Sequence, residues 1–331
     1  GAGEPWKHVA VVGNDRFQGV ATVLVKKTPL TPEEIARVAT VARRLGWEAL
    51  YLPGQPGDGT FQQALTAPNL DDFTRGYYYD VRPSTDDRPF FFQMIYFKNA
   101  LDLMRGKAVS GQTFNYYAVS VLVALLVVSA ALTLVFYVLP LLLSRAVDPL
   151  PRTWGLYFVL LGLGFMFVEI PLIQQGSLYL GHPSYGLTVV LFSLLVFTGL
   201  GSFWSGSFPS ADLPRRLPRH LLLVAALILL LVLLIEIVMP ATMGAPFVVR
   251  LALSVLFCGG LGFLLGAPFP SGIRLVSEVR VSAIPWVWAL NGGASVTGSI
   301  LAMAVAMGFG YRITLLAGAL IYAAASLVLL A

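Results

Sequence analysis

The sequence predicts an α-helical polytopic membrane protein with about seven transmembrane helices and a small α/β domain in front of them. The chain is 57% hydrophobic and only 12% charged, with a mean hydropathy of +0.77, whereas soluble domains carry about 25% charged residues. Long apolar runs follow one another from about residue 115 onward, and they are continuous rather than alternating. A hydrocarbon core about 30 Å thick needs about 20 apolar helical residues, and continuous runs are typical of helices rather than of barrel strands.

Residues 1–97 form the predicted α/β domain. Three short β-branched runs predict strands at 9–12, 21–25 and 49–52. A helix is predicted between the last two, because Thr31 can cap it and Pro32 suits its first position. Glu33 and Glu34 would face the positive end of its dipole, and Gly46 would end it. This order with a Pro/Gly-rich tail is typical of the end of an α/β sheet.

An acidic turn, Asp86-Asp87-Arg88, follows between two prolines. Neighbouring residues of an extended turn point apart, so we expect a locally capped turn rather than an acid–base pair. The segment is predicted to tie the α/β domain down at the membrane surface. Residues 98–115 are predicted to be an amphipathic linker.

Residues 116–331 form the predicted transmembrane bundle. Its spans are expected at 116–143, 154–178, 185–207, 220–239, 246–269, 284–307 and 312–330. Small residues recur at a spacing of four, as in Gly262/Gly266 and Ala294/Gly298, and this spacing lets helix backbones approach closely. We therefore expect a compact bundle without a wide aqueous pore.

Arginine and lysine predict the orientation, because cytoplasmic loops carry an excess of both. One side of the predicted bundle holds Arg145, Arg152, Arg215, Arg216, Arg219, Arg274 and Arg280. The other side holds Arg250 and Arg312, together with Lys98, Arg105 and Lys107 before the first span. The bias places the C-terminus in the cytoplasm and the N-terminal domain on the outer side.

Several stretches of the chain resemble bacterial polytopic proteins called spermidine synthase-like, in which a major-facilitator-like membrane part is fused to a spermidine synthase domain. The stretches that carry the resemblance are 21–34, 85–92, 167–175, 180–185, 199–202, 268–272 and 288–296. The resemblance covers nearly the whole chain, but only the C-terminal half of the family. It implies the bacterial inner (cytoplasmic) membrane as the location and a partial spermidine synthase or methyltransferase sheet in residues 1–97.

The same resemblance implies that an S-adenosyl ligand would bind to the first half of the α/β domain, on a glycine-rich turn. This chain has no G-x-G-x-x-G element after a strand, and its nearest approach is the single Gly13. No catalytic residue of the family can be assigned to a position here, and we expect no cofactor. One cysteine, Cys258, and three scattered histidines also predict no metal site.

Glu169 is the clearest candidate for a ligand or proton site. It lies in the middle of a span, where a carboxylate costs roughly 2.5–3.5 kcal/mol on insertion scales, so it should face the bundle and find a partner. Gln174 and Gln175 extend the polar stripe, and Asn291 and Ser295 could complete a cavity with it. A structural interpretation remains open for each of these residues, since polar side chains also join helices.

Two further charged residues, Glu236 and Arg250, flank one short loop, and we expect them to pair at the membrane surface.

Three classes of function remain open. The chain could be a non-catalytic scaffold or accessory subunit of a membrane complex, which is the interpretation we favour because no complete S-adenosyl site is present. It could be the membrane half of an aminopropyl- or methyltransferase. It could also be a transporter-like bundle for polyamines or other small amines. The expected partners are the lipid bilayer and other membrane subunits. Nucleic acid is not expected, since the net charge of +5 lies largely in loops between predicted helices.

Overall fold

A computed structural model describes residues 4–14, 20–55, 59–77, 79–91, 94, 96, 116–144 and 147–330. The chain divides into two compact units, Gly1–Pro83 and Ser84–Ala331. The division falls before the acidic turn, so this turn belongs with the helical bundle. The predicted linker at 98–115 lies outside the described residues, as do Arg145, Lys98, Arg105 and Lys107 from the orientation argument.

The first unit is a small sheet with helices, as the sequence predicts. Its strands are β1 (Val9–Asn14), β2 (Val20–Val25) and β3 (Glu48–Tyr51), and its helices are α1 (Pro32–Leu45), α2 (Gly59–Thr66) and α3 (Leu70–Gly76). The sheet order is β2-β1-β3, and both pairs are antiparallel. Val11 therefore lies opposite Val23 on one side and Tyr51 on the other, and it is almost completely buried.

The ends of α1 confirm the predicted caps. The Glu34 N–H donates to Thr31 Oγ1 at 3.3 Å, and the Thr31 N–H donates to the Glu34 carboxylate at 2.9 Å. Gly46 ends the helix with a left-handed φ of 74°. Local sequence signals thus determine where this helix begins and ends.

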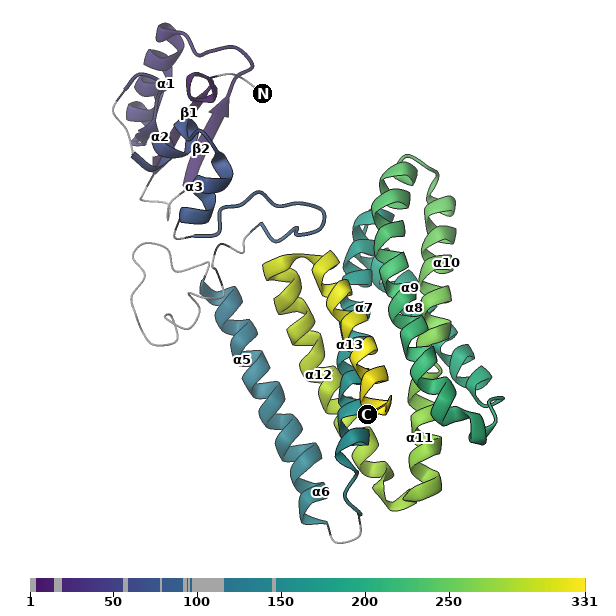
Figure 1. Cartoon of the computed structure of the whole chain (residues 1–331). Coiled ribbons are helices and arrows are strands. Elements are labelled where there is room, and N and C mark those ends of the chain that lie inside the picture. Colours follow the sequence, from purple (N-terminus) through teal and green to yellow (C-terminus); the bar gives the residue numbers. More distant parts are fainter. Residues whose placement is uncertain are drawn as a thin grey trace. The chain divides into compact units, whose positions relative to one another are not determined.

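The second unit contains the seven helical spans that the hydropathy pattern predicts. Among the described residues, seven candidate membrane spans are long and apolar enough to cross a membrane. The helices are α5 (Tyr116–Thr133) with its continuation α6 (Leu139–Leu143), α7 (Arg152–Leu180), α8 (Pro183–Ser205), α9 (Leu213–Thr242), α10 (Phe247–Leu265), α11 (Pro268–Val279), α12 (Ile284–Phe309) and α13 (Tyr311–Leu330). Figure 1 shows them side by side as a bundle.

Helix α7 is the centre of the bundle, where it packs against α8, α12 and α13. Small residues make the close crossings. A Cβ on Gly298 would meet Leu163, and one on Gly318 would meet Val168. The predicted Gly262/Gly266 pair likewise lies against α8, beside Leu194 and Thr198. The expectation of close backbone contacts at small residues is therefore confirmed.

The fifth span is broken between α10 and α11, at Gly266 and Ala267. Pro268 has no N–H, so the Leu264 carbonyl lacks its usual helical donor. It accepts instead from His220 Nε2 at 2.8 Å and, over a long 3.4 Å, from the Ala267 N–H. The Tyr157 hydroxyl donates to the Pro268 carbonyl at 2.8 Å. A side chain from α9 thus replaces a helical hydrogen bond at the break, and a side chain from α7 adds a bond to the first turn of α11.

Candidate functional site

Glu169 lies in the middle of α7 and is 8% exposed. The prediction that it faces the bundle rather than lipid is confirmed. No residue in the described part of the chain forms a hydrogen bond or ion pair with its carboxyl group, so the structure does not identify the expected partner among Gln174, Asn291 and Ser295.

Asn291 joins α12 to α7, whereas Ser295 bonds within α12. Asn291 Nδ2 donates to the Phe158 carbonyl of α7 at 3.1 Å, and Ser295 Oγ donates to the Asn291 carbonyl at 2.9 Å. Both also line a cavity of about 310 Å³ beside the α10–α11 break, together with Thr198 and Ser202 of α8. The structure therefore places these two residues apart from Gln175, beside the broken span.

Gln174 and Gln175 differ although they are neighbours. Gln174 is half-buried, whereas Gln175 is 9% exposed and its Oε1 atom has no hydrogen-bond partner in the described part of the chain. Gln175 lines a second cavity, of about 520 Å³, at the end of the bundle where α7 and α9 finish and α13 begins. A buried carbonyl without a donor costs about 1–3 kcal/mol. A ligand that supplies a donor would remove this cost, so this cavity is the candidate functional site.

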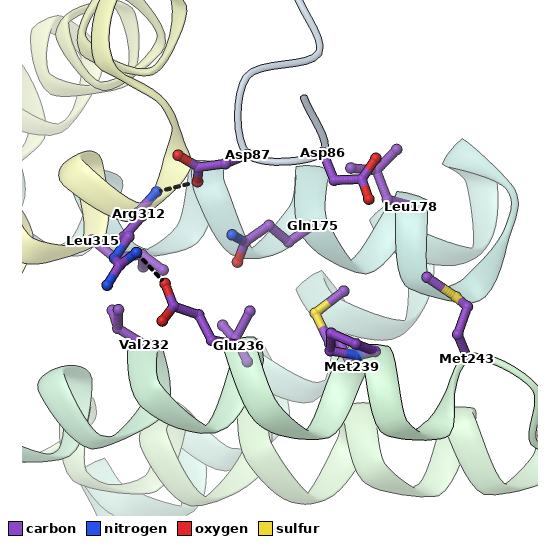
Figure 2. A pocket seen from close by; sticks show the side chains of 12 residues that line it. Asp86, Asp87, Gln175, Leu178, Val232, Glu236, Met239, Met243, Arg312 and Leu315 are labelled. Atoms are coloured by element: carbon purple, nitrogen blue, oxygen red, sulfur yellow. Dashed lines mark hydrogen bonds and ion pairs between the residues drawn. The ribbon is translucent and has the colours of Figure 1, made fainter. Parts of the chain in front are cut away.

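Three helices and one turn form the walls of this acidic cavity (Figure 2). Figure 2 shows Asp86 and Asp87 on one side, Glu236 on the α9 side, and the Gln175 amide extending into the space between them. Apolar side chains complete the lining, and they are Leu178, Val232, Ile235, Met239, Pro240, Met243 and Leu315. A few polar groups on an apolar wall are typical of small-molecule sites.

The acidic turn is fixed to the first residues of α13. Arg88 and Thr85 bond each other through their main chains, which confirms the predicted turn. The Asp87 carbonyl accepts from the Tyr311 N–H at 2.9 Å, and Asp87 Oδ1 accepts from the Arg312 N–H at 2.7 Å. Asp87 thereby caps α13, where a carboxylate also meets the positive end of the helix dipole. This docking brings Asp86 and Asp87 to the cavity.

The expected pair of Glu236 and Arg250 does not form. Arg312 Nη1 instead lies 2.6 Å from Glu236 Oε1, and Arg250 Nη1 donates to the Tyr179 carbonyl at 2.6 Å. The prediction was wrong because Arg250 faces the C-terminal end of α7, whose free carbonyls attract a cation. Glu236 faces α13 and therefore meets Arg312.

The cavity carries a net negative charge. Three carboxylates, of Asp86, Asp87 and Glu236, stand against the single guanidinium of Arg312, so two negative charges are in excess. No cluster of three or more His, Cys, Asp or Glu side chains with metal-binding geometry occurs in the part of the chain that the structure describes. The arrangement suits a cation with a carbon skeleton, because the charged groups lie beside methionine and leucine side chains.

Comparison with known proteins identifies no relative, since no protein-family model, no curated protein and no solved structure matches the chain. The resemblance to spermidine synthase-like proteins therefore stays a prediction. The fold itself fits an integral membrane protein, because seven helices are long and apolar enough to span a bilayer.

Sequence reasoning identified Gln175 but not its companions in the cavity. The local sequence predicts only a turn at Asp86 and Asp87, and only a surface ion pair for Glu236. The sequence does not show that these residues lie together, because Asp87 and Arg312 bond each other although they are 225 positions apart. Two weaker signals were present: Asp86 and Asp87 lie in a proline-bracketed turn, and Glu236 is a lone acid near the end of an apolar span.

Proposed function

We propose that this chain is a membrane-embedded binding protein for a small organic cation, and that the acidic cavity between α7, α9 and α13 is its binding site. This develops the interpretation of a transporter-like bundle for small amines. One observation carries the proposal: Gln175 lines the cavity, and its buried Oε1 has no donor among the residues that the structure describes. An ammonium N–H would satisfy this carbonyl, while Glu236 or Asp86 would balance the charge.

The lining favours an organic cation over a bare metal ion. Calcium takes six to eight oxygen ligands, and magnesium demands a near-ideal octahedron. Among the described residues, no cluster of His, Cys, Asp or Glu side chains has metal-binding geometry, and Arg312 already contacts Glu236. The methionines and leucines of the cavity would instead bury the hydrocarbon part of an amine, which stabilises binding by about 25 cal/mol per Å² of apolar area.

The test is calorimetric titration of the full-length protein in lipid nanodiscs. Probes are 1-aminopentane and 1,5-diaminopentane, with 1-pentanol as the uncharged control and empty nanodiscs as the blank. Glu236→Gln should weaken binding of both amines roughly tenfold, because it removes one carboxylate from the cavity. Glu278→Gln, an exposed acid on α11 that does not line this cavity, should leave binding unchanged. Amines that bind no better than pentanol to the wild-type protein would overturn the proposal.

The arginine bias supports an orientation with the C-terminus in the cytoplasm, and the resemblance to spermidine synthase-like proteins supports the bacterial inner membrane as the location. The cavity lies at the same end of the bundle as the loop between α9 and α10. In this orientation the amine would approach from the outer side.

The role of a non-catalytic scaffold or accessory subunit is the second candidate, and α5 favours it. Only 11% of the apolar window in the Val119–Leu143 span is buried within the chain, and α5 packs mainly against α12. Such a helix offers its remaining surface to lipid or to a helix of another subunit. Crosslinking from Phe136, which is 69% exposed, to lipid alone would argue against the scaffold role. The third candidate, the membrane half of an aminopropyl- or methyltransferase, would need its S-adenosyl site from outside this chain.

A further inference from the structure

Arg312 occupies an unusual position for a cation. It is the second residue of α13, at the positive end of the helix dipole, where a basic side chain is unfavourable. Its guanidinium reaches the cavity and contacts Glu236, while its main-chain N–H bonds Asp87. The two roles are separable, because the N–H anchors the helix cap and the side chain alone enters the cavity.

The contact with Glu236 is also one that can be exchanged. The Arg312 side chain is 52% exposed and the Glu236 side chain 40% exposed, and exposed pairs contribute only about 0–1 kcal/mol. The contact joins Arg312 Nη1 to Glu236 Oε1 at 2.6 Å, and both side chains are exposed enough for water or a ligand to replace either partner. A long flexible side chain at the edge of a cavity can move out without disturbing the turn or the helix.

We propose that Arg312 is a tethered counter-cation, which holds Glu236 while the cavity is empty and gives it up to the cationic group of the ligand. This inference rests on the proposed function, since it needs a cationic ligand. Arg312 is then the residue that sets affinity and selectivity. Because a ligand has to displace Arg312 from Glu236, weakly charged ligands bind with lower affinity. While no ligand is bound, Arg312 neutralises the Glu236 carboxylate beside the membrane.

Removing the guanidinium is the direct test, with the same protein and probe as above. Arg312→Gln keeps the main-chain N–H to Asp87 and leaves three carboxylates unopposed. The affinity for 1-aminopentane should rise roughly tenfold at low salt, and the gain should shrink as the salt concentration increases. Arg216→Gln is the matched control, because Arg216 pairs with Asp212 at 3.2 Å and is also 52% exposed, but it does not line the cavity.

A double variant keeps the test decisive. Arg312→Gln combined with Glu236→Gln restores the original excess of two negative charges, so its affinity should return to within a few-fold of the wild-type value. A double variant as tight as Arg312→Gln alone would contradict the exchange mechanism.

The outcomes separate this inference from the proposed function. If the wild-type protein binds no amine, the proposed function fails. If it binds 1-aminopentane and Arg312→Gln binds it equally well or more weakly, only the counter-cation role fails. If Arg312→Gln instead loses affinity for the zwitterion 5-aminopentanoic acid and gains none for 1-aminopentane, Arg312 recognises an anionic ligand group, and the inference is overturned.

Discussion

At the scale of single residues, Gln175 shows the conflict between stability and binding. Its buried Oε1 has no donor within the ranges that the structure describes, and such an unsatisfied acceptor costs the folded protein about 1–3 kcal/mol. Gln175→Met has a similar volume and removes this acceptor. We expect the thermal stability to be unchanged or higher, while the affinity for 1-aminopentane falls roughly tenfold.

Gln174→Met is the matched control for this prediction. Gln174 is half-buried on the same helix and does not line the cavity, so its replacement should leave binding unchanged. A clear loss of stability in Gln175→Met, or equal binding by both variants, would show that Gln175 is a packing residue only.

A glycine is required at position 310, next to the Asp87 side chain that lines the cavity. Gly310 links α12 to α13 with a φ of 94°, and a Cβ there would collide with the Asp87 carboxylate. Gly310→Ala should therefore destabilise the folded protein by about 1–3 kcal/mol, seen as a lower thermal midpoint and faster hydrogen exchange at the start of α13. Gly244→Ala, at a position with open space around it, should have little effect. Equal midpoints for the two variants would contradict this role.

Individual residue types predicted the site only in part. The intramembrane carboxyl of Glu169 was expected to be buried, and it is, because lipid is the most costly environment for it. Its bonding partner could not be predicted, since helical spacing shows which residues share a face but not which face of another helix they meet. Asn291 illustrates this, because it bonds the Phe158 carbonyl rather than an acidic side chain.

At the scale of elements, α1 shows where local sequence is sufficient. Its capping box and its left-handed Gly46 can both be predicted from the sequence, because each depends on residues a few positions apart. The Lys26 side chain lowers the pKa of the Glu34 carboxyl, and the Thr31 N–H lowers it further. The folded pKa thus lies below the unfolded value, so the stabilisation is present above the unfolded pKa and is lost as the pH falls through the folded one.

This linkage predicts the pH dependence of α1. In full-length protein, hydrogen exchange over residues 31–45, corrected for the intrinsic rate, should show protection at pH 7 that weakens below the ordinary glutamate pKa of 4.5. Glu34→Gln should start less protected and change less with pH. Glu48→Gln on β3 should follow the wild-type protein, and an identical pH profile for all three proteins would rule out the capping contribution.

The broken fifth span shows where local sequence is insufficient. The stretch 246–269 was predicted to end near Phe269, but α11 continues the span to Val279. The reason is that His220, which lies far away in the sequence, satisfies the Leu264 carbonyl at the break, and Tyr157 holds the first turn of α11. The antiparallel arrangement of the strands similarly depends on long-range pairing, which the order of strands and helices alone does not determine.

At the scale of the whole molecule, hydropathy was sufficient to predict the number of spans, because a bilayer imposes the length and apolarity of each helix. It could not place the acidic cavity, which forms where the ends of α7, α9 and α13 meet the turn at Asp87. Charged residues at span ends are expected in every membrane protein, so their convergence becomes visible only in three dimensions. The side of the membrane on which this cavity lies follows from the orientation.

Orientation is therefore the last prediction, and two single-cysteine variants can measure it in a Cys258→Ala background. Gly244 lies in the exposed loop between α9 and α10, at the cavity end, and Ser207 lies in the exposed loop after α8, at the opposite end. In intact bacterial cells, a membrane-impermeant thiol reagent should label Gly244→Cys and should reach Ser207→Cys only after permeabilisation, because the arginine-rich loops lie on the Ser207 side. The reverse pattern would place the cavity on the cytoplasmic side, and any amine ligand would then have to come from within the cell.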